Sequence, residues 1–217
     1  MSPEHTVRSL QNRIAVARGD RPADLALRGG RVLNVFTGDI VSADVAVSGS
    51  VIAGVGDYRG EREIDLDGAI VLPGFIDIHT HPDKTMTRGL FENKSGTLSE
   101  AIGHFAEFFP TVQVDDFYRR AKKMFELQRS RGVTAVRAHV TVNELVELRA
   151  FEALRKLKAE LEGTFDLQLV AFPGSPVRIE KGDSRYRLLE RAIEGGADAL
   201  GGCPNLAADH RSLTDTL

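Results

Sequence analysis

The sequence predicts an α/β protein whose larger part is a parallel sheet with helices between its strands. Three observations indicate this class. Short glycine-punctuated runs fill residues 23–70, an apolar run leads directly into two histidines, and strand-like runs then alternate with helical patterns to the end. Four such strand–helix units make half of an eight-fold (β/α) barrel, with an open four-stranded parallel sheet as the alternative. We therefore expect two regions, 1–70 and 71–217.

The first region predicts a helix followed by a small β unit. Residues 6–18 suit a short amphipathic helix, which Gly19 and Pro22 close. The runs at 24–27, 31–35, 43–47 and 51–55 are typical of strands, and the glycines at 29–30, 38 and 49 supply turns between them. We expect this unit to be antiparallel, with residues 63–67 as its last strand.

The second region predicts the parallel sheet. Strands are expected at 74–81, 132–140, 165–173 and 197–204, with helices at 115–131, 143–162 and 184–194. Within 143–162 the apolar residues recur at helical spacing, which is typical of core packing: Leu145, Leu148, Phe151, Leu154, Leu157 and Leu161. A doubly wound nucleotide fold is not expected, because the sequence has neither a Gly-x-Gly-x-x-Gly nor a Gly-Lys-Ser/Thr loop after a strand.

The amino-acid composition excludes several classes of protein function and of metal site. The 217 residues are 42% hydrophobic and 27% charged, with a formal net charge of -3, which gives no electrostatic case for nucleic acid or a membrane surface. Cys203 is the only cysteine, so an internal disulfide and a cysteine-rich zinc site are excluded. With no signal peptide pattern and no membrane-length apolar run, we expect a soluble cytoplasmic protein.

His79 and His81 are the candidate metal ligands. They end a very apolar strand, and side chains at positions i and i+2 of a strand point to the same face. Both imidazoles can therefore reach one metal ion at the carboxyl end of the strand, where a parallel barrel places its chemistry. Two strand histidines that bind no metal are the alternative.

Several motifs in order resemble the metal-dependent amidohydrolase superfamily. The run 71–81 is similar to its first barrel strand, and residues 21–70 resemble the N-terminal β-sandwich portion of bacterial adenine deaminases. From residue 79 onward the similarity is to cytosine deaminases, and five motifs carry it: 79–84, 95–102, 132–140, 167–173 and 195–204. The resemblance implies an amidohydrolase-type (β/α)8 barrel with a small β-sandwich portion, of which this chain covers about the first half.

The resemblance also implies a chemistry. One divalent cation, zinc or iron, binds a water and lowers its pKa, and the resulting hydroxide attacks a heterocyclic amidine carbon so that ammonia leaves. His79 and His81 would be two of the ligands, while the family's other ligands and its acid/base residues lie on later strands. The unrelated deaminase fold with His-x-Glu and Pro-Cys-x-x-Cys motifs is excluded, because only one cysteine is present.

Five further residues are candidates to bind the substrate or to orient the ligands. Asp83 and Lys84 follow the histidines as in the family, or they form an exposed salt pair. Leu98 lies where a backbone group of the family contacts the substrate base. The alternative is that the same loop only caps the helix that starts there. His139 ends the second strand, either in the site or as a buried histidine. Gly174 replaces a glutamine that cytosine deaminases use to read the pyrimidine, which puts cytosine in doubt, or it belongs to a simple turn.

The chain as given also supports a non-catalytic interpretation. Half a barrel leaves strand edges and an apolar face open, so it would be inactive alone, or it would associate with itself or with a second half. Two imidazoles make a weak site, because catalytic zinc usually has three protein ligands. We expect the isolated chain to bind metal weakly and to turn over little substrate.

Overall fold

The structure is a computed structural model that describes residues 6–174 and 179–203. Its internal contacts divide the chain into two compact units, Met1–Pro73 and Gly74–Leu217, and each unit has its own sheet. In the part of the chain that the structure describes, no helix is both long enough and apolar enough to span a membrane.

The first unit is a helix and one five-stranded sheet of order β3-β2-β1-β4, in which β5 also pairs with β1. Helix α1 (Val7–Ala17) begins after Thr6, whose side chain accepts a hydrogen bond from the Ser9 N–H. The strands are β1 (Ala23–Leu33), β2 (Ile40–Ser48), β3 (Val51–Gly56), β4 (Gly60–Asp65) and β5 (Ile70–Val71).

This sheet differs from the predicted antiparallel unit. Strand β2 pairs antiparallel with β1 and β3, as expected, but β4 and β5 both pair with β1 in parallel. The described residues of the first unit also form a single sheet, where the resemblance implied a sandwich. Turn residues signal antiparallel hairpins between neighbouring strands, whereas a parallel pairing needs a longer connection that leaves no local signature.

Gly29 and Gly30 form a bulge inside β1 rather than the predicted turn. The register of β1 against β2 shifts between Leu27 and Gly30, and Gly29 has a φ of +65°. A Cβ on Gly30 would lie 2.8 Å from the Leu66 side chain and 2.9 Å from the Val71 side chain, so a larger residue would require these side chains to shift. The strand therefore continues through both glycines as an eleven-residue element.

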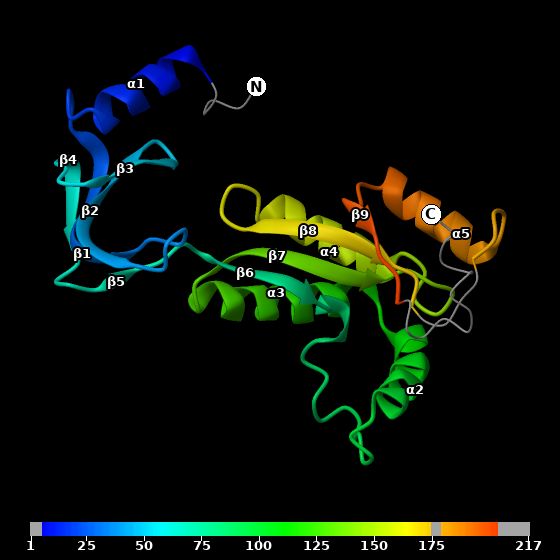
Figure 1. The fold of residues 1–217 in the computed structure, drawn as a ribbon. Helices are drawn as coiled ribbons and strands as arrows, with labels where there is room; N and C mark the ends of the chain where they lie inside the picture. The colour runs from blue at the N-terminus through cyan, green and yellow to red at the C-terminus, as the bar shows by residue number, and fades with distance from the viewer. Residues whose placement is uncertain (1–5, 175–178, 204–217) are drawn as a thin grey trace. The chain divides into compact units, whose positions relative to one another are not determined.

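The second unit is a four-stranded parallel sheet of order β6-β7-β8-β9 with helices packed against it (Figure 1). A short 3₁₀ turn, Pro82–Lys84, follows the first strand. The strands are β6 (Phe75–Thr80), β7 (Val133–Thr141), β8 (Asp166–Phe172) and β9 (Ala199–Leu200), and the helices are α2 (Leu98–Phe108), α3 (Val114–Ser130), α4 (Arg149–Glu160) and α5 (Ser184–Glu194).

The helical stripe predicted over 143–162 is largely confirmed, with a later start. Asn143 Oδ1 accepts the N–H groups of Leu145 and Val146, so residues 143–148 form a turn before α4. Leu154 and Leu157 are fully buried in a core that α3 and α4 make with β7 and β8, while Leu145 is 39% exposed. The fourth strand was predicted at 197–204, but β9 contains only two residues of this range. Position 204 lies outside the described residues.

The other face of this sheet is open in the described part of the chain. Asp77 of β6 bonds to Gln128 of α3 at 2.6 Å, which fixes the helix-facing side of the strand. Its neighbours Ile76 and Ile78 point the opposite way and are 66% and 70% exposed. Parallel strands with helices on one face are expected of half a barrel, and closure into a barrel stays a prediction.

Candidate metal centre

An irregularity at the end of β6 aims the histidine motif at the open face. Asp77 contacts α3 through Gln128, and Thr80 Oγ1 lies 4.0 Å from Met124 Sδ of the same helix. These two helix-facing residues are three positions apart, and the pairing of β6 with β7 shifts between them. The extra residue breaks the strict alternation of the strand, so His79 lies exposed on the side away from α3.

Three imidazole rings gather at the carboxyl ends of β6 and β7. Their centroids are 5.4 Å apart for His79 and His81, 4.4 Å for His79 and His139, and 5.6 Å for His81 and His139. His139 joins the group because Ala138 and Val140, on either side of it, are buried in the helix-facing core. The two motif histidines therefore converge, as expected, and a third histidine lies beside them.

The protonation of the rings suits metal binding. Burial, and then the charge of Lys84, lower the pKa of His81 to about 4. Burial, followed by the nearby His79, also lowers the pKa of His139. Both imidazoles are therefore neutral near pH 7, which is the form that donates a lone pair to a metal. His81 Nδ1 lies 3.0 Å from the carbonyl oxygen of His139.

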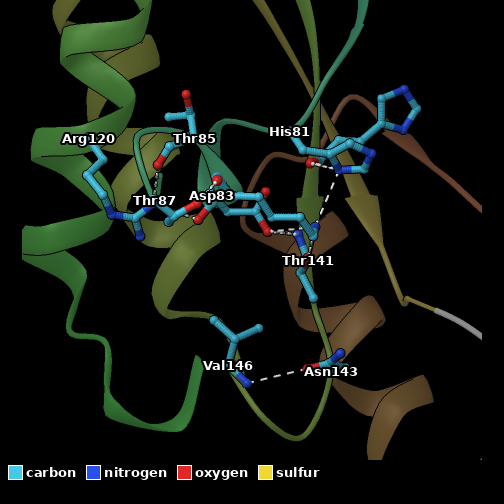
Figure 2. Close-up of polar contacts among 10 residues, drawn as sticks. His81, Asp83, Thr85, Thr87, Arg120, Thr141, Asn143 and Val146 are labelled. Atoms are coloured by element: carbon cyan, nitrogen blue, oxygen red, sulfur yellow. Dashed lines mark hydrogen bonds and ion pairs between the residues drawn. The ribbon is translucent and has the colours of Figure 1, made fainter. Parts of the chain in front are cut away.

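The turn after β6 carries a buried ion pair. Asp83 Oδ2 lies 3.1 Å from Lys84 Nζ, and the Asp83 side chain is completely buried while that of Lys84 is 25% exposed. Asp83 Oδ2 also accepts the Thr141 N–H at 3.2 Å, and Lys84 Nζ donates to Thr141 Oγ1 at 2.6 Å. Burial acts to raise the pKa of Asp83, but the Lys84 charge and the Thr141 contact outweigh it and lower that pKa. The pair thus joins this turn to the end of β7 (Figure 2).

Arg120 of α3 holds the same turn from the helix side (Figure 2). Its Nη1 donates to the carbonyl oxygens of Asp83 at 2.9 Å and of Thr85 at 2.8 Å. Its Nε donates to Asp116 at 2.7 Å, one turn earlier on the helix. A strand and a helix therefore both fix the backbone that follows the two histidines.

The donor chemistry of the two motif histidines fits a divalent transition metal, for which imidazole is a common ligand. Within residues 6–174 and 179–203, however, no group of three or more His, Cys, Asp or Glu side chains is arranged to hold a metal ion. His139 is close, but it does not complete such a group. His79 and His81 thus fit as two members of a ligand set that the described residues do not complete, and their metal role stays a prediction.

Gly174 adopts a conformation that excludes most side chains. Its φ is +80°, and a Cβ there would lie 3.3 Å from Asn143 Nδ2. A glutamine at this position would be strained in this conformation. The rest of the turn suggested for positions 174–176 lies outside the described residues.

Leu98 is the first residue of α2 and is exposed. The predicted cap is present, because Thr97 Oγ1 accepts the Glu100 N–H at 3.3 Å. The Glu100 carboxylate, however, accepts the N–H groups of Ser95 at 2.6 Å and Lys94 at 2.9 Å, not that of Thr97. The contacts in the described residues join neither Leu98 nor Gly174 to the three histidines.

The sequence interpretation missed two residues, Thr141 and Arg120. Thr141 could have been found, because it stands two positions after His139 at the end of the same strand and so shares its face. Arg120 gave a weaker signal, as a charged residue on the buried side of α3 between Phe117 and Met124. A buried arginine of this kind normally has specific hydrogen-bond partners.

Comparisons with known proteins concern the family of the chain rather than the chemistry of this site. No family model matches the chain. The chain is 44% identical over 79 residues to adenine deaminase 1 of Agrobacterium fabrum, which covers 36% of this chain and 14% of that protein. The chain thus spans about a seventh of the length of this curated relative.

Solved structures match more of the chain. 5-Methylcytosine deaminase from Klebsiella pneumoniae, liganded with 5-fluorocytosine, is 28% identical with a TM-score of 0.76, covering 88% of this chain and 46% of that one. Atrazine chlorohydrolase from Arthrobacter aurescens, complexed with zinc, is 17% identical with a TM-score of 0.66, covering 82% of this chain and 46% of that one. At 17% identity the second likeness concerns the fold alone.

Proposed function

This chain belongs to the amidohydrolase superfamily, where its relatives are deaminase-like, and we propose that it carries part of the active site of a metal-dependent hydrolase. The reaction would be the hydrolytic release of ammonia from a nucleobase-like or related cyclic amidine. The observation that carries this proposal is the convergence of His79 and His81 at the carboxyl end of β6.

In this proposal, His79 and His81 would hold one divalent cation, zinc or iron. When bound, the cation supplies Lewis acidity for the activation of water. The neutral state of His81 supports a ligand role, as does the turn that holds its backbone between α3 and β7. A solved structure that shares the fold, atrazine chlorohydrolase, is complexed with zinc.

His139 and Lys84 are the candidates to contact the substrate. His139 has a ring 4.4 Å from that of His79, and its lowered pKa leaves it neutral, able to donate one hydrogen bond and accept another. The Lys84 ammonium lies 3.4 Å from His81 Nδ1 and donates hydrogen bonds to Asp83 and Thr141. The substrate class stays broad, because relatives act on both purine and pyrimidine bases and Gly174 has no side chain to read a base edge.

A second candidate is a non-catalytic half-barrel that functions by association. Two observations favour it: the described residues form no group of three or more side chains arranged to hold a metal, and Ile76 and Ile78 are exposed on the open face. Burying these side chains against a second copy would remove apolar surface from water. Sedimentation equilibrium of the chain distinguishes a monomer from such an assembly.

The test combines metal binding with turnover. Purified chain is titrated with Co²⁺, and ammonia release from cytosine, 5-methylcytosine and adenine is measured with and without metal. We expect His79→Ala and His81→Ala each to weaken Co²⁺ binding at least about 10-fold. His104→Ala is the matched control, because His104 lies on α2 and contacts the Glu92 carbonyl oxygen.

The outcomes separate the two candidates. Ammonia release that needs metal and is lost in His81→Ala supports the hydrolase. Cobalt binding through the two histidines without any ammonia release favours the non-catalytic half-barrel. Cobalt binding that is the same in His81→Ala and His104→Ala contradicts the metal site itself.

A further inference from the structure

The Lys84 ammonium lies among three possible hydrogen-bond partners. Its Nζ is 2.6 Å from Thr141 Oγ1, 3.1 Å from Asp83 Oδ2 and 3.4 Å from His81 Nδ1. The first two distances are those of good hydrogen bonds, and the third is long. Lys84 is therefore held mainly by Thr141 and Asp83, at the edge of the His81 ring.

His81 Nδ1 has two neighbours that make opposite demands on it. The His139 carbonyl oxygen, at 3.0 Å, can only accept, so it requires a hydrogen on Nδ1. The Lys84 ammonium, at 3.4 Å, can only donate, so it requires a lone pair there. A neutral imidazole carries one hydrogen, and the shorter contact favours placing it on Nδ1. Nε2 then keeps its lone pair.

We propose that Thr141 and Asp83 are positioning residues that keep the Lys84 ammonium off His81. With Lys84 so held, the His81 Nδ1–H stays on the His139 carbonyl and the Nε2 lone pair is free for a ligand. The link to metal binding rests on the proposed function, whereas the tautomer of His81 is a property of the metal-free chain.

The buried acid supports this role. Asp83 is completely buried, and within the described residues its Oδ1 has no hydrogen-bond partner, so the desolvation of this carboxylate is only partly offset there. Buried ion pairs of this kind are often less stabilising than apolar side chains of similar volume. Stability alone therefore does not account for the pair. What the geometry does provide is a fixed position for Lys84, because Asp83 Oδ2 binds both the Thr141 N–H and the ammonium.

The experiment reads the tautomer directly. Long-range ¹H–¹⁵N correlation spectra of the ¹⁵N-labelled, metal-free chain distinguish a hydrogen on Nδ1 from one on Nε2. We expect His81 to carry it on Nδ1 in the wild-type chain. Thr141→Val removes the 2.6 Å acceptor but keeps the backbone N–H that binds Asp83. Lys84 then turns to His81 Nδ1, and the population shifts toward the Nε2–H form.

Two further variants separate positioning from a general loss of structure. Thr141→Ser restores the hydroxyl and should restore the wild-type tautomer. Thr134→Val makes the same change on the same strand, where the hydroxyl donates to the Phe75 carbonyl oxygen at 3.4 Å, and should leave His81 unchanged. In the metal arm, Thr141→Val should weaken Co²⁺ binding about 10-fold, and the other two variants should not.

Two outcomes would overturn the proposal, and a third would separate it from the proposed function. An Nε2–H tautomer of His81 in the wild-type chain overturns the proposal, and so does a Thr141→Val chain whose tautomer is unchanged, whatever its cobalt affinity. A wild-type chain that shows the Nδ1–H form and the expected Thr141→Val shift but binds no cobalt would contradict the proposed function while supporting this inference.

Discussion

Replacing Lys84 by methionine tests the buried pair on which the turn after β6 depends. The substitution leaves the Asp83 carboxylate completely buried without its ammonium. Breaking a buried pair from one side costs about 3–5 kcal/mol. The lower end applies here, because Lys84 is a quarter exposed and Asp83 keeps its hydrogen bond from the Thr141 N–H. We therefore expect a loss of about 3 kcal/mol in the free energy of unfolding.

The assay is thermal unfolding followed by circular dichroism. A loss of about 3 kcal/mol corresponds to a fall in Tm of about 6–12 °C, at about 2–4 °C per kcal/mol for a chain of this size. The double variant Asp83→Asn/Lys84→Met removes both charges and should lose only about 1 kcal/mol, because no unpaired charge stays buried.

The control is an exposed ion pair on α3. Arg119 and Asp115 have side chains that are 68% and 79% exposed, so Arg119→Met should change stability by less than about 0.5 kcal/mol. The reasoning is refuted if Lys84→Met loses no more stability than Arg119→Met, or if the double variant is as unstable as the single one.

Two other predictions concern the loops. Hydrogen bonds from Ser95 are the main cause that lowers the pKa of Glu100 to about 2 from 4.5, so this carboxylate stabilises the loop above pH 4.5 and the contribution is lost as the pH falls toward 2. The Ser95 amide should therefore lose protection from hydrogen exchange over this range, and Glu100→Gln should remove that pH dependence. Gly174→Ala should destabilise the chain by about 1 kcal/mol because its φ is +80°, while Gly103→Ala, in open space on α2, should stabilise it by up to about 1 kcal/mol in urea unfolding. Equal effects at both glycines would contradict the strain assigned to Gly174.

Periodicity predicted most of the second unit, because most of its strands and helices have a local pattern, whereas α2 was indicated only by the cap at its start. The α5 bounds coincide with the predicted helix at 184–194, and α3 and β7 are shifted by one residue. The start of α4 was predicted too early, since the apolar spacing of Leu145 and Leu148 continues into a turn that Asn143 holds by hydrogen bonds. In the first unit, the parallel pairing of β4 with β1 depends on contacts distant in sequence.

The residue types of the candidate site could be predicted from the sequence, but the contacts between those residues could not. Spacing alone indicated that His79 and His81 share a face, yet the structure achieves this through a register shift in β6. The salt pair of Asp83 and Lys84 is present, but it is buried rather than exposed, because Thr141 of the next strand supplies a hydrogen bond to each partner. A sequence pattern does not show which residue of a neighbouring strand will contact a turn.

The central claim is that His79 and His81 hold one cation between them. Anomalous diffraction at the zinc edge, from crystals of the chain grown with Zn²⁺, tests it most directly. We expect one peak about 2.0–2.1 Å from an imidazole nitrogen of each of the two residues. A zinc peak bound to only one of these histidines, or elsewhere with the pair empty, would contradict the account.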